Sequence, residues 1–507
     1  MIVQAIQLFF TPEVLIACII GVIGGITVGA LPGLSASMAV ALLIPITFKM
    51  SPAAGLVLLV SVYTAAIYGG SITAVLIHTP GTPSSAATAL DGYEMTKKGK
   101  GLKAIGIVTI ASMLGGTFSA LALLFIAPKL AQISLKFTSL EYFFIAVFGL
   151  TIIGSLAGKS MVKGLMSGMF GLLVGCIGLD IMNGTPRFTM GIINLESGIS
   201  LVPAMIGMFS ISQVLISVEE IRKGKTRILD EGVSGLQGKM IPTKAEFLKI
   251  FPTILRSSVI GTIVGILPGA GSDIGSWVSY NNAKQFSRTP EEFGNGSMEG
   301  IAAAEAANNA VTGGALIPLL TLGIPGSGVT AIMLGGLMIK GLVPGHKLFT
   351  ESGNITYAII IGFLVANILM GIIGLLIAKQ VVKVSVVPMT ILCPIIIGLS
   401  TVGAYAINNS IFDIYIMIVG GIIGYFMRKI GFATAPIILG LILGPLAEQN
   451  FRQSLVLSRG NMFGYFLSRP ISIFLAVLVI ISLFSPIIMK TFSKNTTEST
   501  PADTAKI

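Results

Sequence analysis

Small hydroxyl and glycine residues follow Pro-Gly pairs at four points of the chain, and this pattern is suited to binding an anion. Residues 25–38 read GITVGALPGLSASM, and residues 261–274 read GTIVGILPGAGSDI. Two further pairs begin PGTPSS at residues 80–85 and PGSGVT at residues 325–330. A broken helix leaves free N–H groups at the start of the next segment, and these groups and the helix dipole favour an anion.

Serine side chains can cap such helix starts and can also donate hydrogen bonds to a carboxylate. None of the four motifs contains lysine or arginine, so a substrate would be held by neutral donors, without the desolvation cost of a buried cation. Side-chain amides in the segment before the last break can bind a carboxylate or sodium. The predicted substrate-binding residues are Gly33, Ser35, Ser37, Gly81, Thr82, Ser84, Gly269, Ser272, Asn308, Asn309, Gly326 and Ser327.

Two aspartates lie close to the breaks and are candidates for coupling to an ion. Asp91 follows the break at residues 80–85, and Asp273 lies within the motif at residues 261–274. Ionisable side chains near a membrane interior are functional candidates by default. We expect Na⁺ or H⁺ as the coupling ion, with no cofactor, no metal centre and no catalytic residue.

The composition is that of a membrane protein. The 507 residues are 53% hydrophobic and only 10% charged, whereas a soluble domain carries about 25% charged residues. Apolar runs long enough to span a bilayer recur along the chain, and they predict roughly 10 to 14 membrane-embedded helices. Barrel strands would alternate over about ten residues, and these runs do not. We therefore predict an all-α polytopic membrane protein in contact with the lipid bilayer.

The net charge of +11 comes from loops that border the apolar runs. Lysines cluster at residues 97–103, and lysine and arginine cluster at residues 222–249. The positive-inside rule places both clusters in the cytoplasm, and it makes nucleic-acid binding a poor explanation of the charge. The three cysteines are isolated in apolar runs, so they form neither a metal-ligand motif nor a disulfide framework.

The chain divides into two related halves. Pro268 follows Pro32 at an offset of 236 residues (268 − 32), and six of the nine positions at 25–33 are identical in the second copy. Each half also has a Gly-Gly pair about ten residues before its second Pro-Gly. We predict a first transmembrane half at residues 1–218, a cytoplasmic basic linker at 219–250, a second transmembrane half at 251–492 and a disordered tail at 493–507. The halves are expected to be inverted repeats.

Duplicated helix breaks favour a secondary transporter. Within lipid, a broken helix persists only where protein or a water-filled cavity satisfies its backbone. Broken segments at corresponding positions of two halves indicate a substrate site between the repeats. A cation/proton antiporter and a membrane-embedded hydrolase remain alternatives. For a hydrolase, His78 is the sole histidine in the apolar runs, and no nucleophile elbow accompanies the serines. No Walker motif is present, which argues against direct use of ATP.

Four segments resemble the large permease subunit of tripartite tricarboxylate transporters, the TctA family. They are GALPGLSASMAVALLIPITF, GTPSSAATALDGYEMTKKGKG, GILPGAGSDIGSWVSYNNAKQFS and GIPGSGVTAIMLGGLMIKGLVPG. The resemblance covers nearly the whole chain and all four breaks. One departure is Glu94, which stands where members commonly have proline.

The resemblance implies an ion-coupled importer of tricarboxylates or related organic carboxylates in the bacterial inner membrane. It also implies two protein partners, a small membrane subunit and a periplasmic solute-binding protein. These expectations agree with the anion site reached from the four breaks. An enzyme is not expected.

Overall fold

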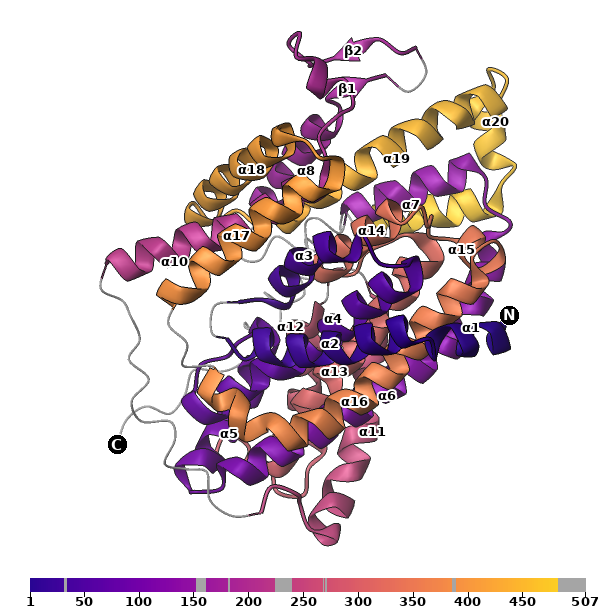
Figure 1. Ribbon diagram of the computed structural model, residues 1–507. Coiled ribbons are helices and arrows are strands. Elements are labelled where there is room, and N and C mark those ends of the chain that lie inside the picture. The colour runs from indigo at the N-terminus through magenta and orange to yellow at the C-terminus, as the bar shows by residue number, and fades with distance from the viewer. Residues whose placement is uncertain are drawn as a thin grey trace, which may run out of the picture.

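The computed structural model describes residues 1–31, 34–151, 161–180, 183–223, 239–267, 269, 271–384 and 389–481. Apart from its connecting loops, the described part of the chain is almost entirely helical, as the sequence predicts (Figure 1). Eight helical segments in these ranges are long and apolar enough to cross a membrane. Five shorter apolar helices accompany them, including α3 (Ala36–Thr47) and α14 (Gly328–Ile339). The chain is therefore a polytopic helical protein.

The helices of the first half run as follows: α1 (Ile2–Phe9), α2 (Pro12–Gly29), α3, α4 (Pro52–Ile77), the 3₁₀ turn η1 (Pro83–Ser85), α5 (Ala86–Lys97), α6 (Gly101–Ser134), α7 (Ser139–Thr151), α8 (Met161–Gly175), the 3₁₀ turn η3 (Ile193–Leu195), α9 (Leu201–Ile206), the π-helical η4 (Gly207–Ile211) and α10 (Ser212–Arg222).

The second half begins with α11 after the basic linker. Its elements are α11 (Lys244–Ile266), α12 (Gly271–Phe286), the 3₁₀ turn η5 (Pro290–Glu292), α13 (Met298–Leu322), α14, α15 (His346–Thr350), α16 (Gly353–Val384), α17 (Met389–Asn408), α18 (Ile411–Lys429), α19 (Ala435–Leu457), α20 (Met462–Leu467) and a final helix over Pro470–Ile481. Much of the linker, residues 224–238, and the tail from residue 482 lie outside the described residues.

One short hairpin departs from the all-helical prediction. Strands β1 (Gly178–Leu179) and β2 (Pro186–Arg187) pair antiparallel where the sequence predicts the end of a membrane helix. The helix stops early because the following segment is rich in turn residues. Asn183 donates its N–H to Asp180 Oδ1 at 2.9 Å, and Gly184 has a positive φ of 65°. These contacts close the hairpin in place of another helical turn.

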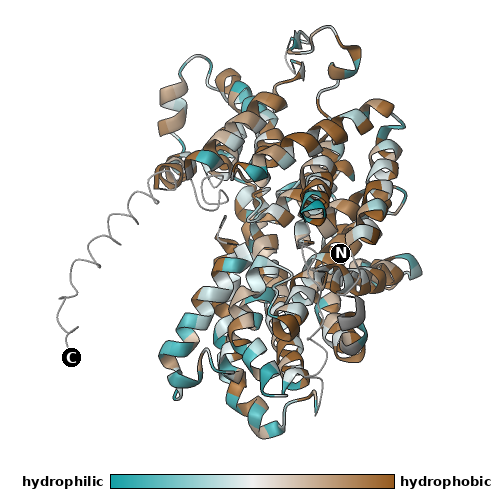
Figure 2. Cartoon of the chain, turned by 90° about the vertical axis from the view of Figure 1, so that its left-hand side faces the viewer, coloured by the Kyte–Doolittle hydropathy of each residue, from teal (hydrophilic) through white to brown (hydrophobic). Residues whose placement is uncertain are grey.

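The helices pack as two groups that meet at α3 and α14. One group contains α2, α4, α6, α11, α13 and α16, and the other contains α7 to α10 and α17 to α19 (Figure 1). Residues 53–76 of α4 and 300–321 of α13 are buried, which explains why neither helix shows one polar face. Hydrophobic residues cover most of the helices, whereas hydrophilic residues concentrate at the lower left of Figure 2. The two buried helices form the centre of the molecule.

The predicted packing glycines make the same contact in both halves. A Cβ added to Gly25 would lie 2.7 Å from Ala65 Cβ, and one added to Gly29 would lie 2.2 Å from the Ala66 carbonyl oxygen. In the second half, Gly261 and Gly265 meet the backbone of α13 in the same way, each at 2.5 Å from a carbonyl oxygen. Glycine therefore allows α2 to approach α4, and α11 to approach α13, at backbone distance.

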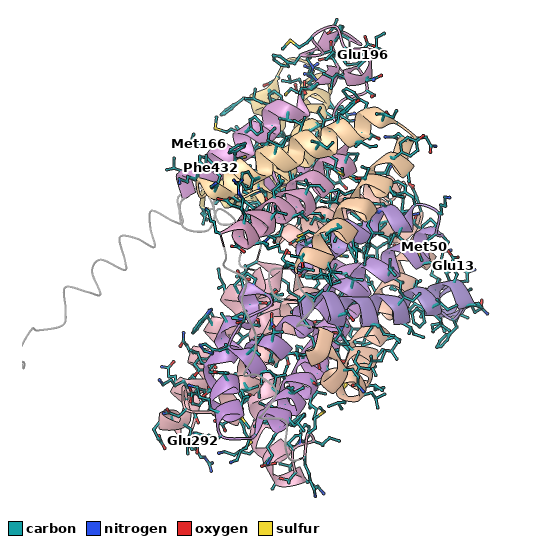
Figure 3. All side chains as sticks on the ribbon, turned by 60° about the vertical axis from the view of Figure 1, so that its left-hand side comes forward. Glu13, Met50, Met166, Glu196, Glu292 and Phe432 are labelled. Atoms are coloured by element: carbon teal, nitrogen blue, oxygen red, sulfur yellow. The ribbon has the colours of Figure 1, made fainter. Side chains whose placement is uncertain are left out.

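Two of the basic segments meet at one end of this packing. Lys103 Nζ forms an ion pair with Glu246 Oε1 at 2.7 Å, which joins the start of α6 to the start of α11. Lys98 Nζ donates to the Asn295 carbonyl oxygen at 2.5 Å, which adds the loop before α13. At the start of α4, the Ser51 N–H donates to Glu13 Oε1 at 2.8 Å. Glu13 and Met50 lie together on the right in Figure 3, far from Glu292.

Candidate functional site

At the first break of each half, one helix ends and the next begins a few residues later. Helix α2 ends at Gly29, and α3 begins after Ser35, whose side chain accepts the Met38 N–H at 3.2 Å. Helix α11 ends at Ile266, and α12 begins at Gly271. Gly269 and Gly271 have φ values of 82° and 63°, which L-residues rarely adopt. The predicted residue Gly33 lies outside the described residues.

The second break of each half follows a buried helix. Helix α4 ends at Ile77, and His78 adopts left-handed backbone and stacks on Tyr93 with ring centroids 4.6 Å apart. Helix α13 ends at Leu322 and is capped by Gly323, whose φ is 70°. Ser327 then caps α14 in a capping box, in which Ser327 and Thr330 each bind the other's backbone N–H. The predicted serine caps are therefore present at Ser35 and Ser327, whereas Thr82 and Ser85 precede η1 and α5 without a side-chain cap.

Within each half, the two breaks touch. A Cβ added to Gly81 would lie 2.4 Å from the Gly29 carbonyl oxygen, and the Gly81 N–H donates to the Gly70 carbonyl oxygen at 3.0 Å. In the second half, a Cβ added to Gly326 would lie 3.3 Å from the Gly265 carbonyl oxygen. The Gly269 N–H donates to the Gly326 carbonyl oxygen at 2.9 Å. In the second half the broken segments therefore satisfy part of each other's backbone, whereas in the first half the second break bonds back to α4.

The helices that follow the breaks pack on their own halves and also contact the other half. Helix α3 of the first half packs on α14 of the second, and α12 of the second half packs on η1 and α5 of the first. Where α3 meets α14, Ser37 Oγ lies 3.4 Å from a Cβ added to Gly328. Lys340, just after α14, donates to the carbonyl oxygens of Thr47 and Met50 near the end of α3, at 2.5 and 2.8 Å. The fold thus brings breaks from both halves together.

A tyrosine hydroxyl links the two breaks of the second half to the first half. The Tyr63 hydroxyl, from the middle of α4, lies beside Ser327 and Ser272 and within electrostatic reach of Asp273. Its side chain is 1% exposed, and in the described part of the chain the two serines are within interaction range of its oxygen but outside normal hydrogen-bond geometry. A buried hydroxyl without a partner is costly unless a ligand or water satisfies it. These residues can donate to one anion.

Four other predicted substrate residues lie in the turn after α4 or in α13. Thr82 and Ser84 are buried in the turn after α4, where their hydroxyls are 3.1 Å apart. Asn308 and Asn309 are fully buried in α13. Asn309 Nδ2 donates to the Thr64 hydroxyl oxygen at 3.0 Å, whereas Asn308 has no hydrogen-bond partner for either amide atom within the described residues. The predicted residues therefore gather around α4 and α13.

The two ion-coupling candidates differ in their surroundings. Asp91 Oδ1 accepts the N–H groups of Gly294, Gly296 and Ser297 at 2.8–2.9 Å, and Oδ2 accepts the Tyr280 hydroxyl at 2.8 Å. Asp91 thus fixes the loop before α13. Asp273 is exposed in the first turn of α12. Coupling by either aspartate stays a prediction.

Glu94, the departure noted in the sequence, is part of a surface ion pair. Its Oε1 lies 2.6 Å from Lys97 Nζ on the same helix, and this hydrogen bond lowers the pKa of the Glu94 carboxyl. An ion pair exposed to solvent in this way contributes little to stability, because water screens the charges.

Sequence reasoning missed Glu305. This residue is fully buried in α13 and accepts hydrogen bonds from Ser71, Thr88 and Ser112, which belong to three other helices. The signal was present in the spacing, because Glu305, Asn308 and Asn309 stand at i, i+3 and i+4 and share one helix face. Attention to the Pro-Gly pairs left this acidic residue outside the predicted site.

Eight membrane-length helices among the described residues, together with the broken helices between them, define a multi-pass membrane protein. The sequence matches the tripartite tricarboxylate transporter TctA family over residues 15–439, and the chain belongs to this family. It is 38% identical over 465 residues to an uncharacterized 52.8 kDa protein in the TAR-I ttuC′ 3′ region of Agrobacterium vitis, covering 91% of each chain. An uncharacterized protein in the TAR-II ttuC′ 3′ region of the same organism is 39% identical over 212 residues, which cover 42% of this chain and 87% of that protein.

Proposed function

We propose that this protein is a secondary transporter that imports tricarboxylates or related organic carboxylates, driven by an ion gradient. It would act in the bacterial inner membrane as the large subunit of a three-component system, with a small membrane subunit and a periplasmic binding protein. Membership of the TctA family supports this proposal. The observation that carries it is the contact between the breaks: the Gly269 N–H donates to the Gly326 carbonyl oxygen at 2.9 Å, and Ser37 Oγ of the first half lies 3.4 Å from a Cβ added to Gly328 of the second.

The chemistry of this region favours a reversibly bound carboxylate. The start of α14 presents free N–H groups, and a capping serine lies at the same point. Hydroxyl and N–H donors select an anion, and the absence of lysine and arginine from the four motifs leaves no fixed charge to hold it permanently. Each hydrogen bond to a charged group contributes about 1.5–3 kcal/mol, so several together give useful affinity.

We further propose that the two halves are inverted repeats. The second Pro-Gly pairs are offset by 245 residues (325 − 80), and Asn309 bonds to Thr64, which is its equivalent at the same offset (309 − 64). Ser71 contacts Glu305, so residue numbers fall along α4 as they rise along α13. Equivalent helices that run in opposite directions where they meet support a pseudo-two-fold axis between them. Such an axis in the membrane plane relates inverted repeats.

A matched pair of capping serines tests the substrate site. Ser327→Ala removes the α14 cap at the break, and Ser297→Ala removes the α13 cap. In both caps the serine Oγ accepts the N–H of the residue three positions later. Both variants lose a cap, which costs about 1 kcal/mol of stability. Calorimetry with citrate and other di- and tricarboxylates should show roughly tenfold weaker binding for Ser327→Ala alone. Equal affinities in the two variants and the unchanged protein would remove the breaks from the substrate site.

A further inference from the structure

Glu305 sits where four helices meet. Its Oε1 accepts hydrogen bonds from Ser71 Oγ of α4, at 2.6 Å, and from Thr88 Oγ1 of α5. Its Oε2 accepts a hydrogen bond from Ser112 Oγ of α6 at 2.8 Å. The side chain is 0% exposed. The carboxyl group is therefore held in a fixed position by three hydroxyl groups at the centre of the protein.

No positive side chain balances this carboxyl group. None of the ion pairs formed among the described residues includes Glu305. The comparison with Glu141 is direct, because Glu141 is also 0% exposed and its Oε1 lies 2.6 Å from Arg469 Nε. A buried carboxylate without a counter-charge is strongly unfavourable, so Glu305 needs either a proton or a bound cation.

Unpartnered amide atoms lie next to the carboxyl group. Asn308, one turn along the same helix, lies close enough for its side chain to interact with the Glu305 carboxylate, and its Oδ1 has no hydrogen-bond partner in the described part of the chain. Asn309 Nδ2 donates to Thr64, but its Oδ1 is also without a partner. Both side chains are 0% exposed. Buried amide oxygens without a donor are uncommon in folded proteins, and such oxygens can coordinate a ligand.

We propose that Glu305, Asn308 and Asn309 bind Na⁺. This inference rests on the proposed function, since Na⁺ would be the coupling ion of the transporter. A monovalent cation bound there neutralises one carboxylate and takes two amide oxygens as ligands. A proton on Glu305 would remove the charge and could satisfy at most one amide oxygen by donation, so the other would stay without a partner. Mg²⁺ or Ca²⁺ would leave a net positive charge, because one carboxylate cannot neutralise a divalent ion.

The site is present once in the chain. At the offset of 245 residues, the position in α4 that corresponds to Glu305 is Val60, and Asn308 corresponds to Tyr63. The repeat therefore does not duplicate the carboxylate. In the second half the acid belongs to the ion site, whereas Tyr63 in the first half faces the serines of the substrate region.

Direct binding of ²²Na⁺ to the purified full-length protein tests the proposal. A scintillation proximity assay without any carboxylate would compare displacement by NaCl, KCl and choline chloride. We expect Na⁺-selective binding, and roughly tenfold or greater weakening in Glu305→Gln and Asn308→Ala, because each removes a ligand oxygen or its charge. Glu141→Gln and Asn450→Ala are matched controls, since Glu141 has Arg469 and Asn450 donates to the Leu446 carbonyl oxygen in α19. Both controls should bind Na⁺ normally.

Each outcome decides the matter. If the unchanged protein shows no Na⁺-selective binding, the proposal is overturned. A site that holds water or a proton would give this result. Unchanged affinity in Glu305→Gln also overturns it. If Glu305→Gln does not fold, Asn308→Ala and Ser112→Ala provide the same comparison. Carboxylate binding is measured separately: a protein that binds ²²Na⁺ but no carboxylate contradicts the proposed function alone, and one that binds carboxylate without any Na⁺ site contradicts this inference alone.

Discussion

Asn309 Nδ2 donates to Thr64 Oγ1 at 3.0 Å, and the two residues occupy corresponding positions of the two halves. Thr64 Oγ1 in turn donates to Asn367 Oδ1 at 2.7 Å, so α4, α13 and α16 are joined in one buried chain of hydrogen bonds. All three side chains are 0% exposed. The point at which equivalent helices meet is therefore polar, specific and shielded from solvent.

Thr64→Val should destabilise the protein without changing its packing volume. The valine leaves Asn367 Oδ1 without its donor and removes one acceptor of Asn309, which costs about 1–3 kcal/mol. Thermal unfolding in detergent measures the change. Thr401→Val is the control, because Thr401 is on the exposed surface of α17 and bonds only to the Ile397 carbonyl oxygen. Equal melting temperatures for the two variants would show that the buried network adds no stability.

Gly29→Ala and Gly24→Ala should differ although both lie on α2. A Cβ at Gly29 would lie 2.2 Å from the Ala66 carbonyl oxygen, whereas a Cβ at Gly24 meets nothing within 4 Å. Backbone atoms of α4 cannot move aside, so Gly29→Ala should cost about 1–3 kcal/mol or more and lower the folded yield. Gly24→Ala should change stability by no more than about 1 kcal/mol. Fluorescence-detected size exclusion after heating ranks the two, and an equally stable Gly29→Ala would contradict the close helix contact.

Gly326→Ala is a cleaner probe of the substrate region than a change at Gly269. An alanine Cβ at Gly326 would have contacts of 3.3–3.8 Å, so the protein should fold. At Gly269 the φ of 82° makes any side chain strained by about 1–2 kcal/mol, so its variants confound folding with binding. We expect a well-folded Gly326→Ala, measured by calorimetry, to bind carboxylates more weakly, because a methyl group occupies the approach to the break. Unchanged affinity would place the substrate elsewhere.

Asp91→Asn should loosen the loop before α13. The neutral amide keeps one acceptor but loses the charge that strengthens the hydrogen bonds from Gly294, Gly296 and Ser297. Hydrogen–deuterium exchange of these amides should become roughly tenfold faster, and Na⁺ binding should persist. Loss of ion-coupled uptake with unchanged exchange at the loop would instead support the coupling role that the sequence suggests for Asp91.

Labelling of single cysteines tests the sidedness. Lys98 and Lys225 should be accessible from the cytoplasm, whereas Glu13 should be accessible from the opposite side. Tyr93 stacks on His78 at the end of α4, and Glu13 binds Ser51 at its start. The 26 residues of α4 separate these ends by about 39 Å, enough to cross a membrane. Labelling of Lys225→Cys by an impermeant reagent in intact cells would contradict this topology.

Uptake of carboxylates should require the partner proteins. Reconstituted alone, this chain should transport slowly, and addition of a soluble binding protein and the small subunit should restore the rate. Full-rate uptake by the chain alone in proteoliposomes would contradict the three-component assembly.

Much of the architecture can be predicted from the composition, the repeat and the break motifs. Low charge and long apolar runs determine a membrane protein, because the bilayer requires each spanning segment to be apolar and to satisfy its own backbone. Helices end within a few residues before each proline and glycine pair, as expected for residues that interrupt a helix, and Gly269 and Gly323 adopt positive φ at two of these ends. The hairpin at residues 178–187 escaped prediction because its strands are two residues long and carry no periodic pattern.

Only the tertiary structure decided which polar residues meet. The sequence shows Asp91, Asp273 and Glu305 alike as acids near the breaks, and it cannot show that four donors surround Asp91 while Glu305 has three hydroxyls and no cation in the described part of the chain. The donors of Glu305 come from positions 193 to 234 residues away. Their approach depends on how α4, α5, α6 and α13 pack, and that packing is set by long-range contacts that no local pattern encodes.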